Sequence, residues 1–179
     1  AIAAMSIVSR FMMFINSALI GFGQGFQPVC GFNFGAKRYD RVLEAFWFCV
    51  KVAITMLTCF GIIAFAVSRP IITAFRREDM EVIRIGTLAL RLQILTLPLQ
   101  AWVIMVNMLT QSIGYGFRAS LVAMGRQGLF LIPSLLILPR ICGILGVQLA
   151  QPVADVFTFV LATFIVLRVL EELKAMREK

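Results

Sequence analysis

The sequence predicts an all-α integral membrane protein with about five transmembrane helices. Of its 179 residues, 60% are hydrophobic and 15% are charged, and the mean hydropathy is +0.93. An ordinary soluble domain has a lower apolar and a higher charged fraction. A run of about 20 mainly apolar residues can cross a bilayer as a helix. The chain holds five such runs, and its charged residues punctuate them.

The predicted spans follow one another with short connections and no linker or second domain. Their approximate ranges are 2–34, 45–67, 85–113, 119–138 and 144–167, and a charged helical tail occupies 168–179. We expect 68–84 to be a short surface connection. Because proline interrupts the backbone ladder of a helix, we expect Pro98 to kink the third span and Pro133 to break the fourth.

The net charge of +8 points to an orientation in the membrane and not to nucleic acid, whose ligands gather basic residues on one solvated face. Cytoplasmic loops are enriched in Lys and Arg. The side of the first loop carries Lys37, Arg38, Arg41, Arg118, Arg126, Arg168, Lys174, Arg177 and Lys179. The other side carries Arg69, Arg76, Arg77, Arg84 and Arg140. The first loop and the C-terminal tail are therefore predicted to be cytoplasmic.

The end of the first span has a composition that would make a poor helix in water. Gly21 and Gly25 lie four residues apart, as do Gly31 and Gly35, and Pro28 lies between the pairs. In a bilayer, small residues let helices approach closely. Irregular backbone at membrane depth lies against protein or a water-filled cavity. We therefore expect this segment to face the inside of a bundle and to pack and bend there without binding substrate.

Two strings in the sequence resemble signatures of the multidrug and toxic compound extrusion (MATE) transporters. One is Gly25-x-x-Pro28-x-x-Gly31-x-Asn33-x-Gly35-Ala36 followed by Arg41, and the other is Pro152–Asp155. The resemblance covers essentially the whole chain, as the C-terminal lobe of a twelve-helix, two-lobed bundle from its eighth helix onward. It implies that the missing N-terminal half is a partner. It also implies a structural or gating motif made of Gly21, Gln24, Gly25, Pro28, Gly31, Asn33 and Gly35.

The third span carries a polar stripe of candidate cavity residues. Gln93, Gln100 and Asn107 recur every seven residues, and Gln111 follows four residues later, so all four lie on one helix face. Amides in this arrangement can line a path for a polar or cationic solute, or they can hold helices together by hydrogen bonds. Both interpretations stay open at this point.

Asp155 is the one acid inside a predicted span, and it shares a face with Gln148, Gln151 and Thr158. An ionisable group within the membrane is a functional candidate because its burial is costly. Asp155 could couple a cation or a proton, or could pair structurally with amides or an arginine. In some MATE subgroups the coupling acid lies on the tenth helix, but the matching third span has no acid, so the coupling group could lie in the missing half. Arg10 and Arg91 are expected to be snorkelling or structural.

The resemblance implies a secondary transporter in the plasma membrane, the inner membrane of a bacterium, surrounded by membrane lipid. It would export organic cations or drugs by alternating access in exchange for Na⁺ or H⁺, with no enzymatic activity and no other cofactor. A lipid-linked oligosaccharide flippase of the same superfamily is an alternative, with a cavity that could be basic only through Arg10, Lys51 and Arg91. A membrane enzyme or a non-transport scaffold is a further alternative.

The residues that usually build catalytic or metal sites are scarce. The chain has no His, and its four Cys lie in or beside apolar spans without a Cys-x-x-Cys spacing. We therefore expect buried small hydrophobes, with neither a metal site nor a disulfide. Catalytic clusters of acids are also missing from the pattern, which argues against the enzyme. Prolines within most of the spans argue against a simple scaffold.

Overall fold

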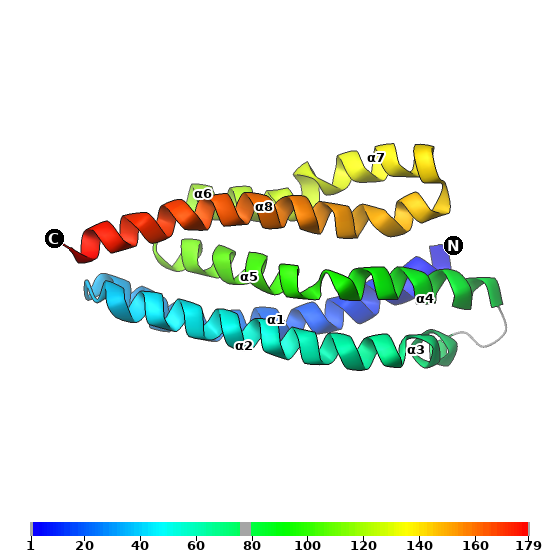
Figure 1. The fold of residues 1–179 in the computed structure, drawn as a ribbon, viewed down its shortest axis with the longest axis horizontal. Coiled ribbons are helices and arrows are strands. Elements are labelled where there is room, and N and C mark those ends of the chain that lie inside the picture. Colours follow the sequence, from blue (N-terminus) through cyan, green and yellow to red (C-terminus); the bar gives the residue numbers. More distant parts are fainter. Residues whose placement is uncertain (1, 76–79, 179) are drawn as a thin grey trace.

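The computed structural model describes residues 2–75 and 80–178, and every regular element in these ranges is helical, which confirms the predicted fold class. The elements are α1 Ile2–Gly35, α2 Tyr39–Ala66, α3 Ser68–Phe75, α4 Met80–Leu95, α5 Leu97–Ser112, α6 Gly116–Met124, η1 Gly125–Leu129, α7 Leu131–Cys142 and α8 Ile144–Arg177. The long helices lie side by side along one axis (Figure 1). By length and composition four helical stretches can cross a membrane, and the bent pair α4–α5 makes a fifth.

The first two helices form a hairpin with a tight turn. Helix α1 continues through Pro28 to Gly35, and Lys37 adopts a left-handed φ of 56° in the turn. Helix α2 begins at Tyr39, earlier than the predicted residue 45, so that Arg41 lies in its first turn and not in the loop. At the same end of the bundle, Arg177 of the tail forms a 2.7 Å ion pair with Asp40.

The predicted third span is broken as the proline indicated. Helices α4 and α5 meet at an angle of 50°, and Pro98 is in the first turn of α5. Its missing N–H falls where a helix start has no intrahelical partner to lose. The connection before this span is more ordered than a surface loop: α3 occupies Ser68–Phe75, and α4 already begins at Met80. Arg76 and Arg77, which entered the charge comparison, lie outside the described residues.

The prediction that Pro133 breaks the fourth span is wrong. Pro133 is the third residue of α7, so its lack of an N–H removes no bond from the helix interior. The irregularity comes earlier, at the π-helical turn η1, where the Phe130 N–H donates to the Gly125 carbonyl at 3.1 Å. The helix then continues through Pro139 to Cys142. Single π-helical turns often occur at functional sites.

The glycine contacts predicted for α1 are not formed within the described helices. An added Cβ would meet no atom within 4 Å at Gly21, Gly25 or Gly35. Gly31 has a neighbour only at ordinary distance, the Ser112 carbonyl oxygen at 3.5 Å. The tight contact is at Gly23, where a Cβ would lie 3.0 Å from Met108 Cγ. The spacing was read correctly, but the face that carries it is exposed, because α1 turns its other side to α5.

A close approach of backbone to backbone occurs between α7 and α8. Gly143 turns the chain with a φ of 58°, and Gly146 lies directly against the Leu138 carbonyl group. A Cβ at Gly146 would overlap that carbonyl, and because the overlapping atoms belong to the backbone they cannot move aside like a flexible side chain. The α7–α8 hairpin therefore requires glycine at this position.

We expect Gly146→Ala to lower the free energy of unfolding by about 1–3 kcal/mol through overpacking. Denaturant unfolding of the purified protein in detergent measures the change. Gly25→Ala is the matched control, because an added Cβ there meets nothing within 4 Å. Equal stability of the two variants would contradict the close approach.

The predicted position of Trp102, on the side of its helix away from the polar stripe, agrees with the structure. Its indole Nε1 donates to Thr163 Oγ1 on α8 at 3.0 Å, and its ring packs against Phe46, Trp47 and Phe159. Trp102 thus joins α5 to α2 and α8. All four cysteines are free, as expected.

Candidate functional site

A buried ion pair lies where η1 meets α8. Arg126 Nε is 3.6 Å from Asp155 Oδ1, and the two side chains are 18% and 2% exposed. Asp155 is the acid that the sequence places inside a span. Transfer of two charges from water to such a place costs several kcal/mol for each ion, so the pair needs additional hydrogen bonds.

Asp155 receives these bonds on both carboxylate oxygens. Gln100 Nε2 donates to Oδ2 at 2.7 Å, and Thr96 Oγ1 donates to the same oxygen at 3.2 Å. Gln151 Nε2 donates to Oδ1 at 3.3 Å. The break between α4 and α5 is what turns Thr96 toward α8. In this arrangement the carboxylate is satisfied by protein groups and is not open to a solute.

Arg126 is held by oxygens from three different helices. Its Nη2 donates to Gln100 Oε1 at 3.1 Å and to Asn16 Oδ1 at 3.4 Å, and its Nε faces Asp155. Gln100 therefore bonds both members of the ion pair, one with its amide nitrogen and one with its oxygen. The guanidinium occupies a position in which oxygens of α1, α5 and α8 surround a positive charge.

The ion pair forms part of the wall of a pocket of about 500 Å³. Arg126 and Gln100 line it, and so do residues of α1, α4, η1, α7 and α8. The polar part of the remaining lining consists of Ser9, Asn16, Ser17, Gln93, Gln127 and Gln151. Methionines and leucines complete the wall, a mixture that suits a solute with both apolar and hydrogen-bonding surface.

The polar stripe of the third span divides into two parts. Gln93 and Gln100 are buried and line the pocket. Asn107 and Gln111 lie further along α5, where Gln27 Nε2 of α1 donates to Gln111 Oε1 at 2.9 Å and Gln111 Nε2 donates to Asn107 Oδ1 at 3.3 Å. The first pair is placed for cavity lining and the second for joining helices, so each interpretation fits half of the stripe.

Arg126 is the residue of the site that the sequence analysis missed. It was counted with the cytoplasmic basic residues, although it lies inside the predicted span 119–138, and the structure places it in the bundle. The signal was available: an arginine within an apolar span is a functional candidate by the same argument that selected Asp155. Without Arg126 the remaining basic residues still favour the same orientation.

The other candidate residues have local structural contacts. Gln148 Nε2 donates to the Ile85 carbonyl at 3.2 Å, and Thr158 Oγ1 donates to the Ala154 carbonyl at 2.7 Å. Asn33 Nδ2 of the glycine motif donates to the Val29 carbonyl at 2.7 Å, while Gln24 is exposed. None of the basic residues considered for a flippase cavity, Arg10, Lys51 and Arg91, lines the pocket that holds the ion pair.

The comparison with known proteins decides the family, because the MatE family model matches residues 1–137. The chain belongs to the MATE family. It is accordingly part of a multi-pass protein of the cell membrane, in a family of transporters.

Individual MATE proteins resemble the chain over nearly all of its length. It is 25% identical over 166 residues to the multidrug export protein MepA of Staphylococcus haemolyticus, which covers 93% of this chain and 36% of MepA. It is 35% identical to the multidrug transporter DinF-BH, solved in complex with a drug, with a TM-score of 0.76 over 92% of this chain and 36% of that one. MATE structures in inward-facing and outward-facing conformations, at 16% and 17% identity, both match 99% of the chain with TM-scores of 0.87. The chain spans less than half the length of these relatives.

Proposed function

We propose that this chain is the C-terminal lobe of a secondary transporter that exports organic cations or other drugs in exchange for sodium ions or protons. The observation that carries the proposal is the polar pocket with the buried Arg126–Asp155 pair in its wall. The family supports it, since MepA is a multidrug export protein and DinF-BH was solved with a drug. Transport of this kind makes and breaks no covalent bond, so the lobe needs to bind, release and move.

Alternating access by rocking of two lobes is consistent with the fold of this one. It resembles inward-facing and outward-facing MATE structures equally well, as expected for a lobe that moves as a unit. The N-terminal half would form the second lobe. The exposed glycine face of α1, which includes Gly21 and Gly25, lacks side chains that would hold another helix away, and we assign it to that contact.

Ion coupling would act through Arg126, which behaves as a tethered cation. A proton on Asp155 would remove the negative charge that holds the guanidinium. A sodium ion would use oxygens of the kind that now face Arg126, those of Asp155, Gln100 and Asn16. Either event would free Arg126 to move, and because this residue lines the pocket, the charge that a drug meets there would change.

The test is transport by inverted membrane vesicles that contain the complete transporter. We expect one gradient, of sodium or of protons, to drive uptake of a fluorescent organic cation, and Asp155→Asn to abolish the acceleration by that gradient. Asp40→Asn is a matched control, because Asp40 pairs with Arg177 at an exposed position. Uptake that neither gradient accelerates would contradict antiport. Acceleration that persists in Asp155→Asn would move the coupling group out of this lobe.

A further inference from the structure

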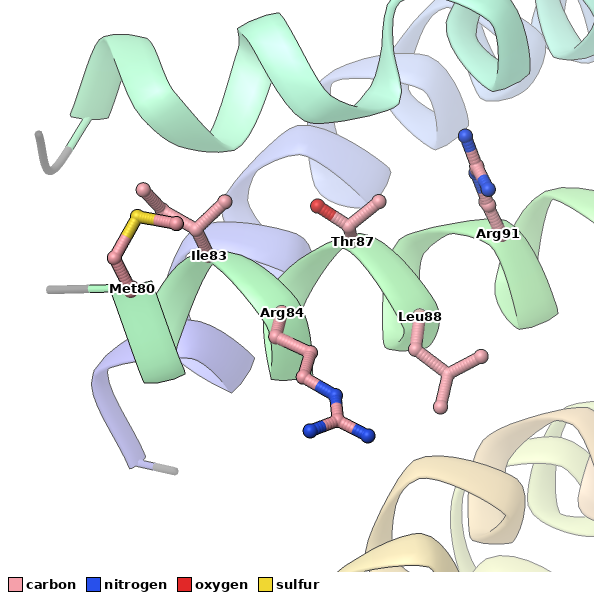
Figure 2. A pocket seen from close by; sticks show the side chains of 6 residues that line it. All are labelled: Met80, Ile83, Arg84, Thr87, Leu88 and Arg91. Carbon is pink, nitrogen blue, oxygen red and sulfur yellow. The ribbon is translucent and has the colours of Figure 1, made fainter.

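A second pocket, of about 540 Å³, lies on α4 at the end of the bundle that carries α3. Arg84 and Arg91 line it together with Thr87, Met80, Ile83 and Leu88 (Figure 2). The two arginines are seven residues apart and so extend from nearly the same helix face, and their guanidinium groups lie on opposite sides of the pocket. We propose that this pocket binds the phosphate group of an anionic phospholipid and that the neighbouring apolar groove holds an acyl chain of the same lipid.

The guanidinium of Arg91 is held in a defined orientation. Its Nε donates to Ser68 Oγ at 2.9 Å, and its Cζ is 4.9 Å from the centre of the Phe65 ring. A planar guanidinium fixed by one N–H retains a pair of parallel donors for two oxygens of a phosphate. Thr87, between the arginines, has a buried hydroxyl without a hydrogen-bond partner in the described part of the chain. A rotation about its χ1 would turn this donor into the pocket.

The depth of Arg91 in the membrane also fits a lipid headgroup. Ser68 and Phe65, its two contacts, lie at the end of α2, the helix with a mean hydropathy of 2.2 in its apolar window. Arg91 is therefore level with the place where a membrane-spanning helix leaves the hydrocarbon. Arg84 is two helical turns farther out, about 10 Å along the axis. Phosphate groups of the bilayer lie at this boundary, whereas the rest of α4 continues into the apolar layer.

An apolar groove of about 440 Å³ continues from the arginines toward the membrane interior. It lies between α2 and the bend of α4–α5, and its walls include Ile62, Phe65, Leu95 and Pro98. Phe65 belongs to both parts of the surface, because it stacks on Arg91 and lines the groove. A cationic mouth above an apolar groove matches a phospholipid, which carries both chemistries in one molecule. A free phosphate ion would use the mouth and leave the groove empty.

The experiment measures lipid binding to the complete transporter, purified in neutral detergent, by native mass spectrometry and by the thermal shift. The probes are phosphatidylglycerol, phosphatidylcholine and inorganic phosphate. We expect phosphatidylglycerol to bind and to raise the Tm, and the other two to have little effect. Arg84→Gln combined with Arg91→Gln should weaken phosphatidylglycerol binding roughly 30-fold. Arg10→Gln combined with Arg140→Gln is the matched control, with two exposed arginines removed elsewhere.

A second variant tests the groove in case the arginine variant fails to fold. Leu95 is 66% exposed and lines the groove, so Leu95→Trp fills it from the open side without disturbing the core. It should weaken phosphatidylglycerol binding at an unchanged Tm of the lipid-free protein. Three results would overturn the proposal: undiminished lipid binding by both variants, an equal effect of inorganic phosphate, or no bound phospholipid in the parent protein because another segment of the transporter fills the groove. None of these depends on drug transport, so the outcome is separate from that of the proposed function.

Discussion

The Arg126→Met variant of the complete transporter should lose about 3–5 kcal/mol of its free energy of unfolding, because it leaves a buried charge without a counter-ion. Asp155 is 2% exposed, and methionine fills a volume similar to that of arginine while removing the positive charge. The hydrogen bonds from Arg126 to Gln100 and Asn16 are lost as well. Denaturant unfolding in detergent micelles measures the change.

The double variant Arg126→Met with Asp155→Asn separates the ion pair from the packing. Removing both charges takes away the uncompensated carboxylate, so the double variant should recover most of the lost stability. It should nevertheless fail to couple drug uptake to an ion gradient. Arg10→Met, at an exposed position of α1, is the control and should stay within about 0.5 kcal/mol of the parent. Additive losses in the double variant would show that the two residues do not act as a pair.

Gln100→Leu should reduce transport at least tenfold and lower the free energy of unfolding by about 1–3 kcal/mol, because it leaves buried charged partners with unmet hydrogen bonds. Gln100 is 2% exposed and bonds both Asp155 and Arg126, at 2.7 and 3.1 Å. Leucine has a similar size but can replace neither bond. Because the ion pair lines the pocket, the same substitution should disturb both folding and transport.

Asn107→Leu is the matched control for Gln100→Leu on the same face of α5. Asn107 is partly exposed, and its side-chain oxygen accepts a bond from Gln111 at 3.3 Å outside the pocket. We expect its substitution to cost less than about 1 kcal/mol and to leave vesicle transport near the parent rate. Similar transport defects in the two variants would indicate that the stripe acts as one continuous path.

The sequence alone was sufficient for the elements that a bilayer dictates. A helix in lipid must satisfy its backbone groups within itself, so the length of each apolar run predicts a span almost independently of its neighbours. Pro98 predicted the bend of the third span for a similarly local reason. The fourth span shows the limit, since Pro133 lies in the first turn of α7, where it breaks nothing, and no single residue announced the π-helical turn at Gly125–Leu129.

The direction in which each helix face points depends on the tertiary structure. The glycine spacing of α1 was visible in the sequence, but whether Gly25 meets a neighbour depends on how α1 is rotated against α5, and here Gly23 makes the close contact. The polar stripe likewise continues past the pocket because heptad spacing describes a face and not the depth at which a cavity ends. Packing of several helices sets both, and no short stretch of sequence encodes it.

The sequence by itself determined that this protein is an α-helical membrane protein of MATE type and that Asp155 is an acid within it. Only the tertiary structure decided what Asp155 does with its charge, because its partner Arg126 is distant along the chain and reaches it from the π-helical turn, while Gln100 and Thr96 reach it from the α4–α5 break. The physical reason is the range of the interactions. Apolar length and proline act within one helix, whereas a buried charge is compensated by whichever donors the packing brings within hydrogen-bonding distance.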